Sequence, residues 1–427
     1  MKKFGLILLM LCLVLTVVSV NAAPKKVKIE VGCWPAMDAG YNKWMPEFNK
    51  KYPNIDVTVK ALGYGDYHNG LVTAIAAGEG APDVACIEIG YIAQFVASGG
   101  MVDLNKAPYS AKQYKKRFVA YKWAQASTDD GKLIALPVDI APACAYYRRD
   151  LFAEAKVDIN NIKTMEDLYA AAKKISADTN GDGKNDRWFI ADAANIAQMI
   201  LHSDPDQMLY FNKKGQCIVD KERFKLAFYW AQKFRKEGLD AGIGAWSNEW
   251  YQAFQNGTVA YEPSGAWLGG HLKNWMAPKT AGKWGVHMWP ALKAGQKPMS
   301  GNWGGSFMAI PEQCKHKKEA WTLIKYACLN RDAQLTAFKV SDSFPALKSA
   351  WNDPMFNEKM DFFAGQQARL LWVKIAKAVP EVVTNKFDNV ASAIVGSELA
   401  SCLNEGKDVN KALADAKEQI NKRIRRG

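Results

Sequence analysis

Apolar residues in the first sixty positions recur first with the period of a strand and then with that of a helix. Residues 27–31 alternate apolar and charged side chains, which is typical of a half-exposed strand. Residues 41–48 place Tyr, Trp, Met and Phe at positions i, i+3, i+4 and i+7, so they predict a helix with one apolar face, although Pro46 should distort it. Residues 55–59 alternate again and predict a second strand.

The same order of elements continues along the chain. Residues 71–77 are small and mostly apolar and predict a helix, and the apolar run at residues 84–89 predicts a third strand. Strands that alternate with helices are typical of an α/β lobe whose sheet is largely parallel. We therefore expect such a lobe at the start of the protein.

A second unit begins near Leu136. Thr164 and Asp167 have the spacing of a helix-capping box, and residues 222–237 predict another amphipathic helix. From about Pro345 onward the chain is predicted to be mainly helical. Short apolar runs predict strands at residues 259–261, 286–289 and 306–310.

Composition narrows the class of protein. The 427 residues are 49% hydrophobic and 23% charged, which excludes a disordered chain, a fibre and a protein with many membrane spans. The 56 Lys and Arg residues outnumber the 43 Asp and Glu residues, which gives a net charge of +13. Such a charge would suit binding to nucleic acid or to an acidic membrane surface, or it would serve solubility alone. The basic residues are dispersed except at residues 422–426, so we expect no nucleic-acid partner.

Residues 1–22 have the pattern of a cleavable export signal. Lys2 and Lys3 precede an almost wholly apolar run at residues 4–20, and the small residues up to Ala22 suit a signal peptidase. The alternative is a membrane anchor, because the run is near the lower length limit for a spanning helix. We expect cleavage after Ala22 and export across the inner membrane to the periplasm.

The cysteines that follow this segment are odd in number and widely spaced. They form no CxxC pair, which argues against zinc and thioredoxin-type redox sites. One or two disulfides are possible, and the sequence leaves their pairing open. The seven residues are Cys33, Cys86, Cys144, Cys217, Cys314, Cys328 and Cys402.

Seven short segments, in order along the mature chain, resemble the signatures of family 1 extracellular solute-binding proteins. They include Tyr-Pro-Asn-Ile-Asp-Val at residues 52–57, Leu-Pro-Val-Asp at 136–139 and Gly-Ala-Trp at 265–267. The other four lie at residues 77–84, 94–104, 146–152 and 304–310. The resemblance implies the component of an ATP-binding-cassette (ABC) importer that captures the substrate, usually a sugar, and delivers it to membrane permease subunits.

The family's fold is a two-lobed periplasmic-binding-protein fold. Each lobe is an α/β unit with a mixed, largely parallel sheet flanked by helices, and a multi-segment hinge joins the lobes. The resemblance implies an N-terminal lobe of residues 23–138 and 305–342 and a C-terminal lobe of residues 139–304 and 343–427. The chain would cross between them near residues 139, 300–304 and 341–345. Ligand would touch both lobes only when they close, so binding stabilises the closed state. We expect a monomer that requires no cofactor.

Aromatic residues and carboxylates near strand ends are the candidate ligand contacts. A pyranose stacks its apolar C–H face on an aromatic ring, and its hydroxyls need polar partners. Loops at the carboxyl ends of α/β strands face the ligand. The candidates are Trp34, Tyr64, Asp66, Tyr67, Glu88, Asp139, Trp267, Trp303 and Gly304. Core packing is the alternative for most of the fifteen Trp residues, and a hinge hydrogen bond is the alternative for Asp139.

Residues 178–186 follow part of the spacing of a calcium-binding EF-hand loop. The oxygen ligands would come from Asp178, Asn180, Asp182, the Lys184 carbonyl and Asp186. Phe189 stands where the bidentate Glu should be, so the motif is incomplete. A structural calcium ion is a candidate, and a turn rich in Asp, Asn and Gly is the alternative.

Enzyme motifs are missing from the sequence. It contains no HExxH, no GxSxG and no phosphate-binding loop. A secreted glycosidase would also be rich in Trp and needs two carboxylates, a role that the sequence leaves open for Glu88 with Glu262. We expect a binding protein. The alternatives are a carbohydrate-active enzyme and a binding protein for another solute, such as a glycerol phosphate ester.

Overall fold

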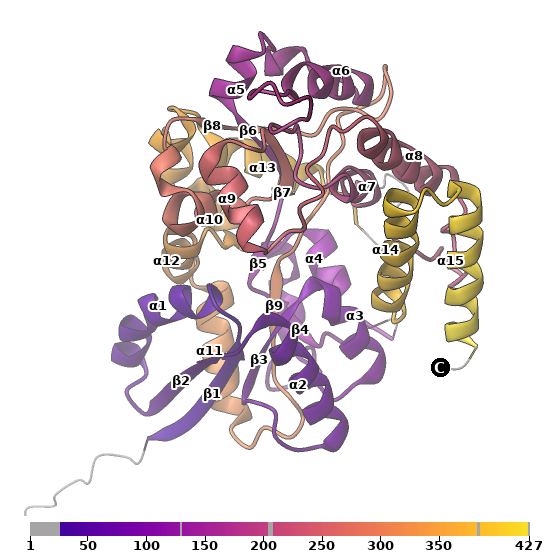
Figure 1. The fold of residues 1–427 in the computed structure, drawn as a ribbon. Coiled ribbons are helices and arrows are strands. Elements are labelled where there is room, and N and C mark those ends of the chain that lie inside the picture. The colour runs from indigo at the N-terminus through magenta and orange to yellow at the C-terminus, as the bar shows by residue number, and fades with distance from the viewer. Residues whose placement is uncertain (1–25, 129, 204–207, 382–384, 426–427) are drawn as a thin grey trace, which may run out of the picture.

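The computed structural model describes residues 26–128, 130–203, 208–381 and 385–425, so the predicted export signal lies outside the described residues. Figure 1 shows two groups of elements, one formed around the N-terminal strands and the other around the middle of the chain. No helix among the described residues is long and apolar enough to cross a membrane.

The first lobe is built on a five-stranded sheet in the order β2-β1-β3-β9-β4. Strand β1 pairs in parallel with β2 and β3, whereas β9 runs antiparallel to β3 and β4. The sheet of this lobe is therefore mixed, as predicted, and four of its five strands run in the same direction. Its strands are β1 (Val27–Cys33), β2 (Ile55–Ala61), β3 (Val84–Glu88), β4 (Ala135–Pro137) and β9 (Ser306–Ala309).

Helices cover both faces of this sheet. Helix α1 buries the predicted face of Tyr41, Trp44 and Phe48 and packs on α12, and it continues through Pro46. Helix α2 lies on the opposite side, where Tyr67 packs against Gly32 of β1. The helices of this lobe are α1 (Met37–Lys51), α2 (Tyr64–Ala77), α3 (Ile89–Ser98), α4 (Ala120–Gln125), α11 (Lys317–Leu329) and α12 (Arg331–Ser341).

The second lobe has a smaller sheet in the order β7-β6-β8. Both of its pairings are antiparallel, so the expectation of a largely parallel sheet is wrong for these strands. Parallel bridges at Trp188–Val259 and Ile190–Asp240 extend its edge. The strands are β6 (Ala143–Arg148), β7 (Tyr261–Gly265) and β8 (Trp284–His287).

The helices of the second lobe include the two that the sequence predicted most directly. Helix α6 begins with a capping box in which Thr164 and Asp167 bond reciprocally, and α8 carries the buried Phe224, Phe228 and Phe234. The helices are α5 (Arg149–Glu154), α6 (Met165–Ile175), α7 (Ala194–Leu201), α8 (Glu222–Lys236), α9 (Asn248–Asn256), α10 (Trp267–His271), α13 (Ala368–Ala378), α14 (Asp388–Asn404) and α15 (Val409–Ile424).

Short helical turns connect the longer elements. One of them, η3 (Leu272–Met276), is a π-helical turn that follows α10 directly. The 3₁₀ turns are η1 (Ala111–Arg117), η2 (Ile159–Asn161), η4 (Pro278–Thr280), η5 (Lys348–Asn352), η6 (Pro354–Asn357) and η7 (Asp361–Phe363).

Three crossing segments lie side by side between the lobes. Strand β5 (Asp139–Ile140) pairs antiparallel with β10 (Phe344–Pro345), and Pro142 forms a bridge with Asn302. These are the three places at which the family resemblance put the hinge. The η5 turn packs on α12 of the first lobe, and Leu347 bridges to Phe118. The chain after the third crossing therefore returns to the first lobe before it enters α13.

The seven cysteines among the described residues are all free and buried. The described residues thus contain no disulfide, and the one or two that the sequence left possible are not formed. Burial raises the pKa of the Cys33 thiol to about 12, so this thiol stays protonated at neutral pH. The cysteines act as small apolar residues of the core.

Candidate functional site

The ends of β1 and β2 bring an aromatic group to the edge of the first lobe. The ring of Trp34 meets Tyr64 edge-on at 5.8 Å and Tyr67 at 6.0 Å between ring centroids. Tyr64 is 45% exposed, whereas Tyr67 is buried and its hydroxyl donates to the Gly32 carbonyl at 2.8 Å. Tyr64 therefore presents its ring outward, and Tyr67 anchors α2 to the sheet.

Glu88 links this group to the start of α3. Its Oε2 accepts a hydrogen bond from the Gly90 amide at 2.6 Å and another from the Tyr64 hydroxyl at 3.1 Å. Burial raises the pKa of Glu88, and these two donors oppose the shift. Asp66 lies exposed in the first turn of α2. The first lobe thus presents the ring of Tyr64 beside the hydrogen-bonded carboxylate of Glu88.

Two aromatic rings that the sequence did not single out complete the first-lobe group. His68 stacks on Tyr91 at 4.1 Å between centroids, with 12° between the ring planes, and also contacts Trp34 at 4.9 Å. Burial lowers the pKa of His68 to about 4, so its ring is neutral at pH 7. No sequence motif distinguishes these two residues, because only the packing of α2 on α3 brings them together.

Asp139 is a hinge residue in this structure. It is 8% exposed, and its Oδ1 accepts a hydrogen bond from the Ser306 amide at 2.6 Å, which ties the first crossing to β9. The neighbouring Lys122 is fully buried, with its Nζ 3.9 Å from the centre of the Phe307 ring and without a hydrogen-bond partner among the described residues. Burial lowers the pKa of Lys122 to about 7, against the attraction of Asp139 and Glu88.

Gly305 allows this close packing. Its φ is +95°, and a Cβ at this position would lie 2.9 Å from the Asp139 carbonyl oxygen and 3.0 Å from Lys122 Nζ. The double glycine of the family signature therefore fits a crowded, left-handed stretch of the hinge.

In the second lobe, Trp267 is hydrogen-bonded to the crossing segment that contains Trp303. Its Nε1 donates to the Trp303 carbonyl at 2.8 Å, and its ring is half-buried. A Cβ on Gly265 would lie 2.5 Å from Trp267 Nε1 and 2.6 Å from the Trp303 carbonyl oxygen, so glycine allows this close approach. Trp303 stacks on His202 at 5.0 Å, and Gly304 lies beside Trp267.

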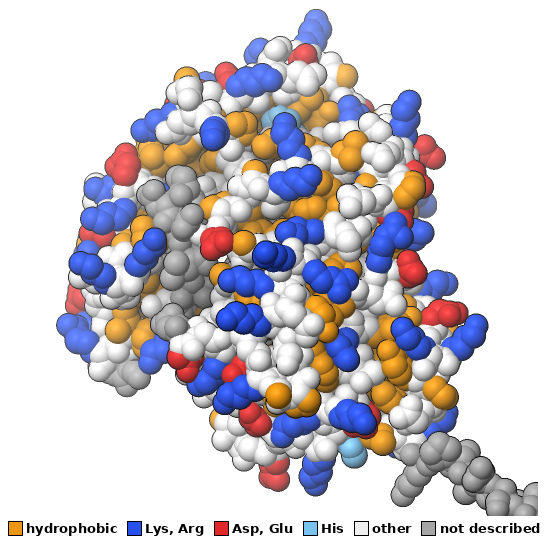
Figure 2. All heavy atoms as spheres, turned by 180° about the vertical axis from the view of Figure 1, so that it is seen from behind, with side chains coloured by type: hydrophobic (Ala, Val, Ile, Leu, Met, Phe, Trp, Pro, Cys, Tyr) orange, Lys and Arg blue, Asp and Glu red, His pale blue; other side chains and the backbone are white. Residues whose placement is uncertain are grey.

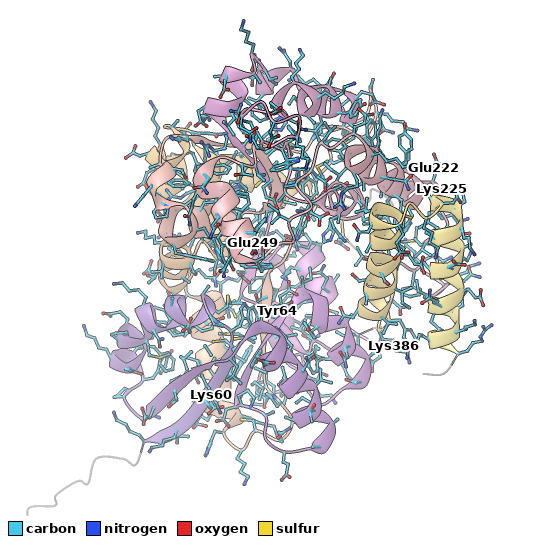
Figure 3. All side chains as sticks on the ribbon, viewed as in Figure 1. Lys60, Tyr64, Glu222, Lys225, Glu249 and Lys386 are labelled. Carbon is cyan, nitrogen blue, oxygen red and sulfur yellow. The ribbon has the colours of Figure 1, made fainter. Side chains whose placement is uncertain are left out.

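Trp246 covers one face of Trp267. The two indoles stack with centroids 5.3 Å apart and 20° between their planes. Trp267, a ligand contact that the sequence predicted, lies beneath Trp246, which is 54% exposed and is therefore the outward ring of this pair. The dense run of Trp residues between 246 and 303 was the available signal, but it could not separate this residue from its buried neighbours. Figure 3 shows the start of α9, with Glu249, and the start of α2, with Tyr64, near the level at which the lobes meet.

A cavity of about 150 Å³ lies between the lobes, and its lining includes neighbours in sequence of both aromatic groups but none of their stacked indole and tyrosine rings. Gly90, next to Glu88 and Tyr91, lines it from the first lobe, and Gly304 lines it from the crossing. Gln125 Oε1 and Asp388 Oδ1 on its wall find no hydrogen-bond partner among the described residues. Burial raises the pKa of Asp388 to about 7. No sequence pattern indicated Gln125 or Asp388, because they come from helices that are far apart in the chain.

The acidic loop directs its carboxylates at its own backbone. The Asp178 carboxylate accepts hydrogen bonds from the amides of Gly181 at 2.6 Å and Gly183 at 2.7 Å, and Asp186 accepts one from the Thr179 amide at 2.9 Å. Among the described residues, no group of three or more His, Cys, Asp or Glu side chains is placed to hold a metal ion. These contacts fit a hydrogen-bonded turn, and the calcium prediction remains to be tested.

Glu262, the possible second carboxylate of an enzyme, lies in the core. It is 2% exposed, and its Oε1 accepts hydrogen bonds from Asn195 Nδ2 at 2.9 Å and Trp250 Nε1 at 3.3 Å. Burial raises the pKa of Glu262 to about 8, so the group is mainly protonated at neutral pH. Its position supports the wall that carries Trp246 and Trp250, whose rings are 5.5 Å apart.

Among curated proteins, the chain resembles an arabinooligosaccharide-binding protein of Bacillus subtilis. The two are 25% identical over 375 residues, which is 84% of each chain. A shorter match, 28% identical over 158 residues, links 34% of this chain to 36% of the sn-glycerol-3-phosphate-binding periplasmic protein UgpB of Rhizobium meliloti.

Comparison with solved structures supports the same relationship. The ABC transporter associated binding protein from B. animalis subsp. lactis, solved in complex with beta-1,6-galactobiose, superposes with a TM-score of 0.76 at 27% identity and covers 93% of this chain and 97% of that one. A family model described as bacterial extracellular solute-binding protein matches residues 43–364. With this match over most of its length, the two-lobed fold and the hinge between the lobes, the chain belongs to the bacterial extracellular solute-binding proteins.

Proposed function

We propose that this protein captures an oligosaccharide between its lobes and delivers it to the permease of an ABC importer. The observation that carries the proposal is that both lobes have an exposed aromatic ring, while the cavity between the lobes has buried polar atoms without partners among the described residues on its wall. Tyr64 and Trp246 are 45% and 54% exposed, and Gln125 and Asp388 each have a buried oxygen without a partner among the described residues. Sugars match this combination, because they have apolar ring faces and many hydroxyl groups.

The relatives support a sugar as the ligand. One is an arabinooligosaccharide-binding protein, and another was solved with a galactobiose. A phosphate ester would need a cationic partner, and the described residues that line the cavity include no Lys or Arg. The sugar is therefore favoured over a glycerol phosphate ester.

The family acts outside the cytoplasm, and we propose a periplasmic location reached through cleavage of residues 1–22. We further propose a monomer whose partners are the ligand and the permease. Figure 2 shows Lys and Arg side chains spread over the rear face, which supports a solubility role for the positive charge.

We also propose that the protein binds sugar without cleaving it. Glu88 is occupied by the Gly90 amide and the Tyr64 hydroxyl, and Glu262 is buried and bonded to Asn195 and Trp250. Prolonged incubation of the pure protein with arabinooligosaccharide should release no shorter sugars, and release that is lost in Glu88→Gln would identify an enzyme.

A thermal-shift screen tests the choice of ligand. The panel contains arabinose, linear arabinooligosaccharides, beta-1,6-galactobiose, maltose and sn-glycerol 3-phosphate. A ligand at a hundredfold excess over its dissociation constant adds about 2.7 kcal/mol to the free energy of unfolding. We expect at least one of the sugars to raise the melting temperature. A shift with glycerol phosphate alone would replace the sugar with the phosphate ester.

A further inference from the structure

Aromatic rings of the second lobe continue beyond Trp267 in an unbroken row. The centroid of Trp267 is 5.3 Å from that of His271, His271 is 5.5 Å from Trp275, and Trp275 is 5.1 Å from Tyr251. Trp246 stacks on Trp267 and contacts His271 at 5.8 Å. We call these five residues the aromatic row.

The outer members of the row are exposed although the chain buries most of its tryptophans. Trp246 is 54% and Trp275 is 49% exposed. Nine of the fifteen Trp residues are buried, namely Trp44, Trp123, Trp230, Trp250, Trp284, Trp289, Trp321, Trp351 and Trp372. Keeping large apolar rings in water is unfavourable, and adjacent exposed rings are typical of a binding surface.

The backbone that presents the two exposed indoles is unusual at both positions. Trp246 has φ +68°, a left-handed conformation that is strained for a residue with a side chain. Trp275 lies in the π-helical turn η3, which interrupts the regular helix after α10. Strained residues and π-helical turns cluster at functional sites, because a fold retains them only where they position a side chain for use.

The row is longer than one sugar ring can cover. A single pyranose or furanose ring stacks on one aromatic face, and here Trp246 and Trp275 each contact His271, at 5.8 and 5.5 Å, but make no ring contact with each other among the described residues. Burial lowers the pKa of His271 to about 4, so the ring between them is neutral at pH 7 and continues the uncharged surface. A ligand that uses both indoles must therefore have more than one ring.

We propose that the aromatic row is an extended carbohydrate-binding surface on which two successive units of a linear oligosaccharide stack. One unit covers Trp246, which Trp267 supports from behind, and the next unit lies on Trp275 beside Tyr251. This inference rests on the proposed function, and it adds that the protein selects oligosaccharides over their monosaccharides by contact with the outer indole.

Isothermal titration of the mature protein, residues 23–427, with ligands of increasing length tests the inference. The probes are arabinose and its linear di-, tri- and tetrasaccharides, galactose with beta-1,6-galactobiose, and maltose with maltotriose. We expect affinity to rise about tenfold when a unit that reaches Trp275 is added. Trp275→Ala should remove that rise and leave the affinity for the shortest binding ligand unchanged, whereas Trp246→Ala should weaken every ligand.

Two further variants keep the test decisive. Tyr229→Ala removes a ring of similar exposure, 52%, from α8 outside the row, and it should change no dissociation constant. Trp275→Gln retains a residue that favours helix and should reproduce Trp275→Ala, which separates loss of the ring from damage to the turn.

The outcomes separate this inference from the proposed function. Sugar binding with the same affinity at every length, or a loss in Trp275→Ala that is equal for short and long ligands, would overturn the extended surface and leave the binding function intact. If no sugar of the panel binds the wild-type protein, both the proposed function and the extended surface fail.

Discussion

The indole of Trp267 makes two contacts. Its Nε1 donates a hydrogen bond to the Trp303 carbonyl, and its ring stacks on Trp246. A residue in this position contributes to the stability of the fold and also supports the ligand surface. The sequence predicted a ligand contact at Trp267, and the structure shows a half-buried ring with one face covered by Trp246 rather than a freely exposed platform.

Trp267→Phe should therefore reduce stability and affinity together. The variant retains an aromatic ring but loses the hydrogen bond from Nε1 to the Trp303 carbonyl, which should cost about 1 kcal/mol in the free energy of unfolding. Affinity for a bound sugar should fall because Trp246 loses its fixed support. Denaturant unfolding and titration measure the two effects. Trp321→Phe on α11 is the control, which should lower stability alone. Undiminished stability with a sharp loss of affinity would instead show that Trp267 acts as a freely exposed platform for the ligand.

Glu262 makes a second prediction at the scale of one residue. Burial raises the folded-state pKa of Glu262 from its ordinary value of 4.5 to about 8, so between these values the folded protein holds a proton that the unfolded chain releases. The stability that protonated Glu262 contributes to the folded state is fully present below pH 4.5 and is lost as the pH rises toward 8. Each pH unit in this window removes about 1.4 kcal/mol of stability from this one group.

Glu262→Gln should flatten that pH dependence, because glutamine resembles the protonated acid and does not titrate. We expect the variant to gain stability relative to the wild type between pH 5 and pH 8 in chemical denaturation. Glu47→Gln, on the exposed surface of α1, should leave the slope unchanged. Parallel stability curves for Glu262→Gln and the wild type would show that the buried carboxyl titrates normally.

At the scale of elements, periodicity and capping were good guides and strand pairing was not. The helix that contains Tyr41 and Trp44 formed as predicted, and so did the capping box at Thr164. The direction of strands in the second sheet was wrong, because β6 pairs with β7 and β8, which lie more than a hundred residues later in the chain. Local pattern predicts that a strand exists, and tertiary packing selects its neighbours.

The loop at residues 178–186 gives a test at this scale. If it binds calcium as its spacing predicts, millimolar calcium should raise the melting temperature and a chelator should lower it, because a ligand of the folded state stabilises that state. Asp182→Ala should then abolish the difference. Identical melting curves in calcium and in chelator would support the turn in which Asp178 bonds to the amides of Gly181 and Gly183.

At the scale of the whole molecule, three crossings join the lobes, and α3 and α12 of the first lobe also contact α14 and α10 of the second. Strands β5 and β10 pair over two residues each, and the remaining crossing adds the bridge from Pro142 to Asn302. These contacts must rearrange when the lobes open or close, and ligand contacts made with both lobes can shift the population toward closure.

A bound sugar should therefore compact the protein. Small-angle scattering of the mature chain should give a smaller radius of gyration with a saturating sugar than without it, because only the closed arrangement lets both lobes contact the ligand. The comparison uses a sugar that titration has already shown to bind, with a non-binding sugar of similar size as the control. Equal radii in all three samples would exclude hinge closure.

The sequence by itself determined the elements, the family and the class of side chain that the site would use. Regular apolar spacing is a local property of the sequence, and short family signatures can be recognised from the order of residues alone. It could not determine where a side chain points. Tyr64 and Tyr67 are one helical turn apart, yet one faces outward and the other donates to Gly32 in the core. Trp246 is one of seven tryptophans between residues 246 and 303, and only the structure shows that its ring covers Trp267. Tertiary structure decided these points, because the direction, cover and exposure of a ring depend on elements that are distant in the chain and adjacent only after folding.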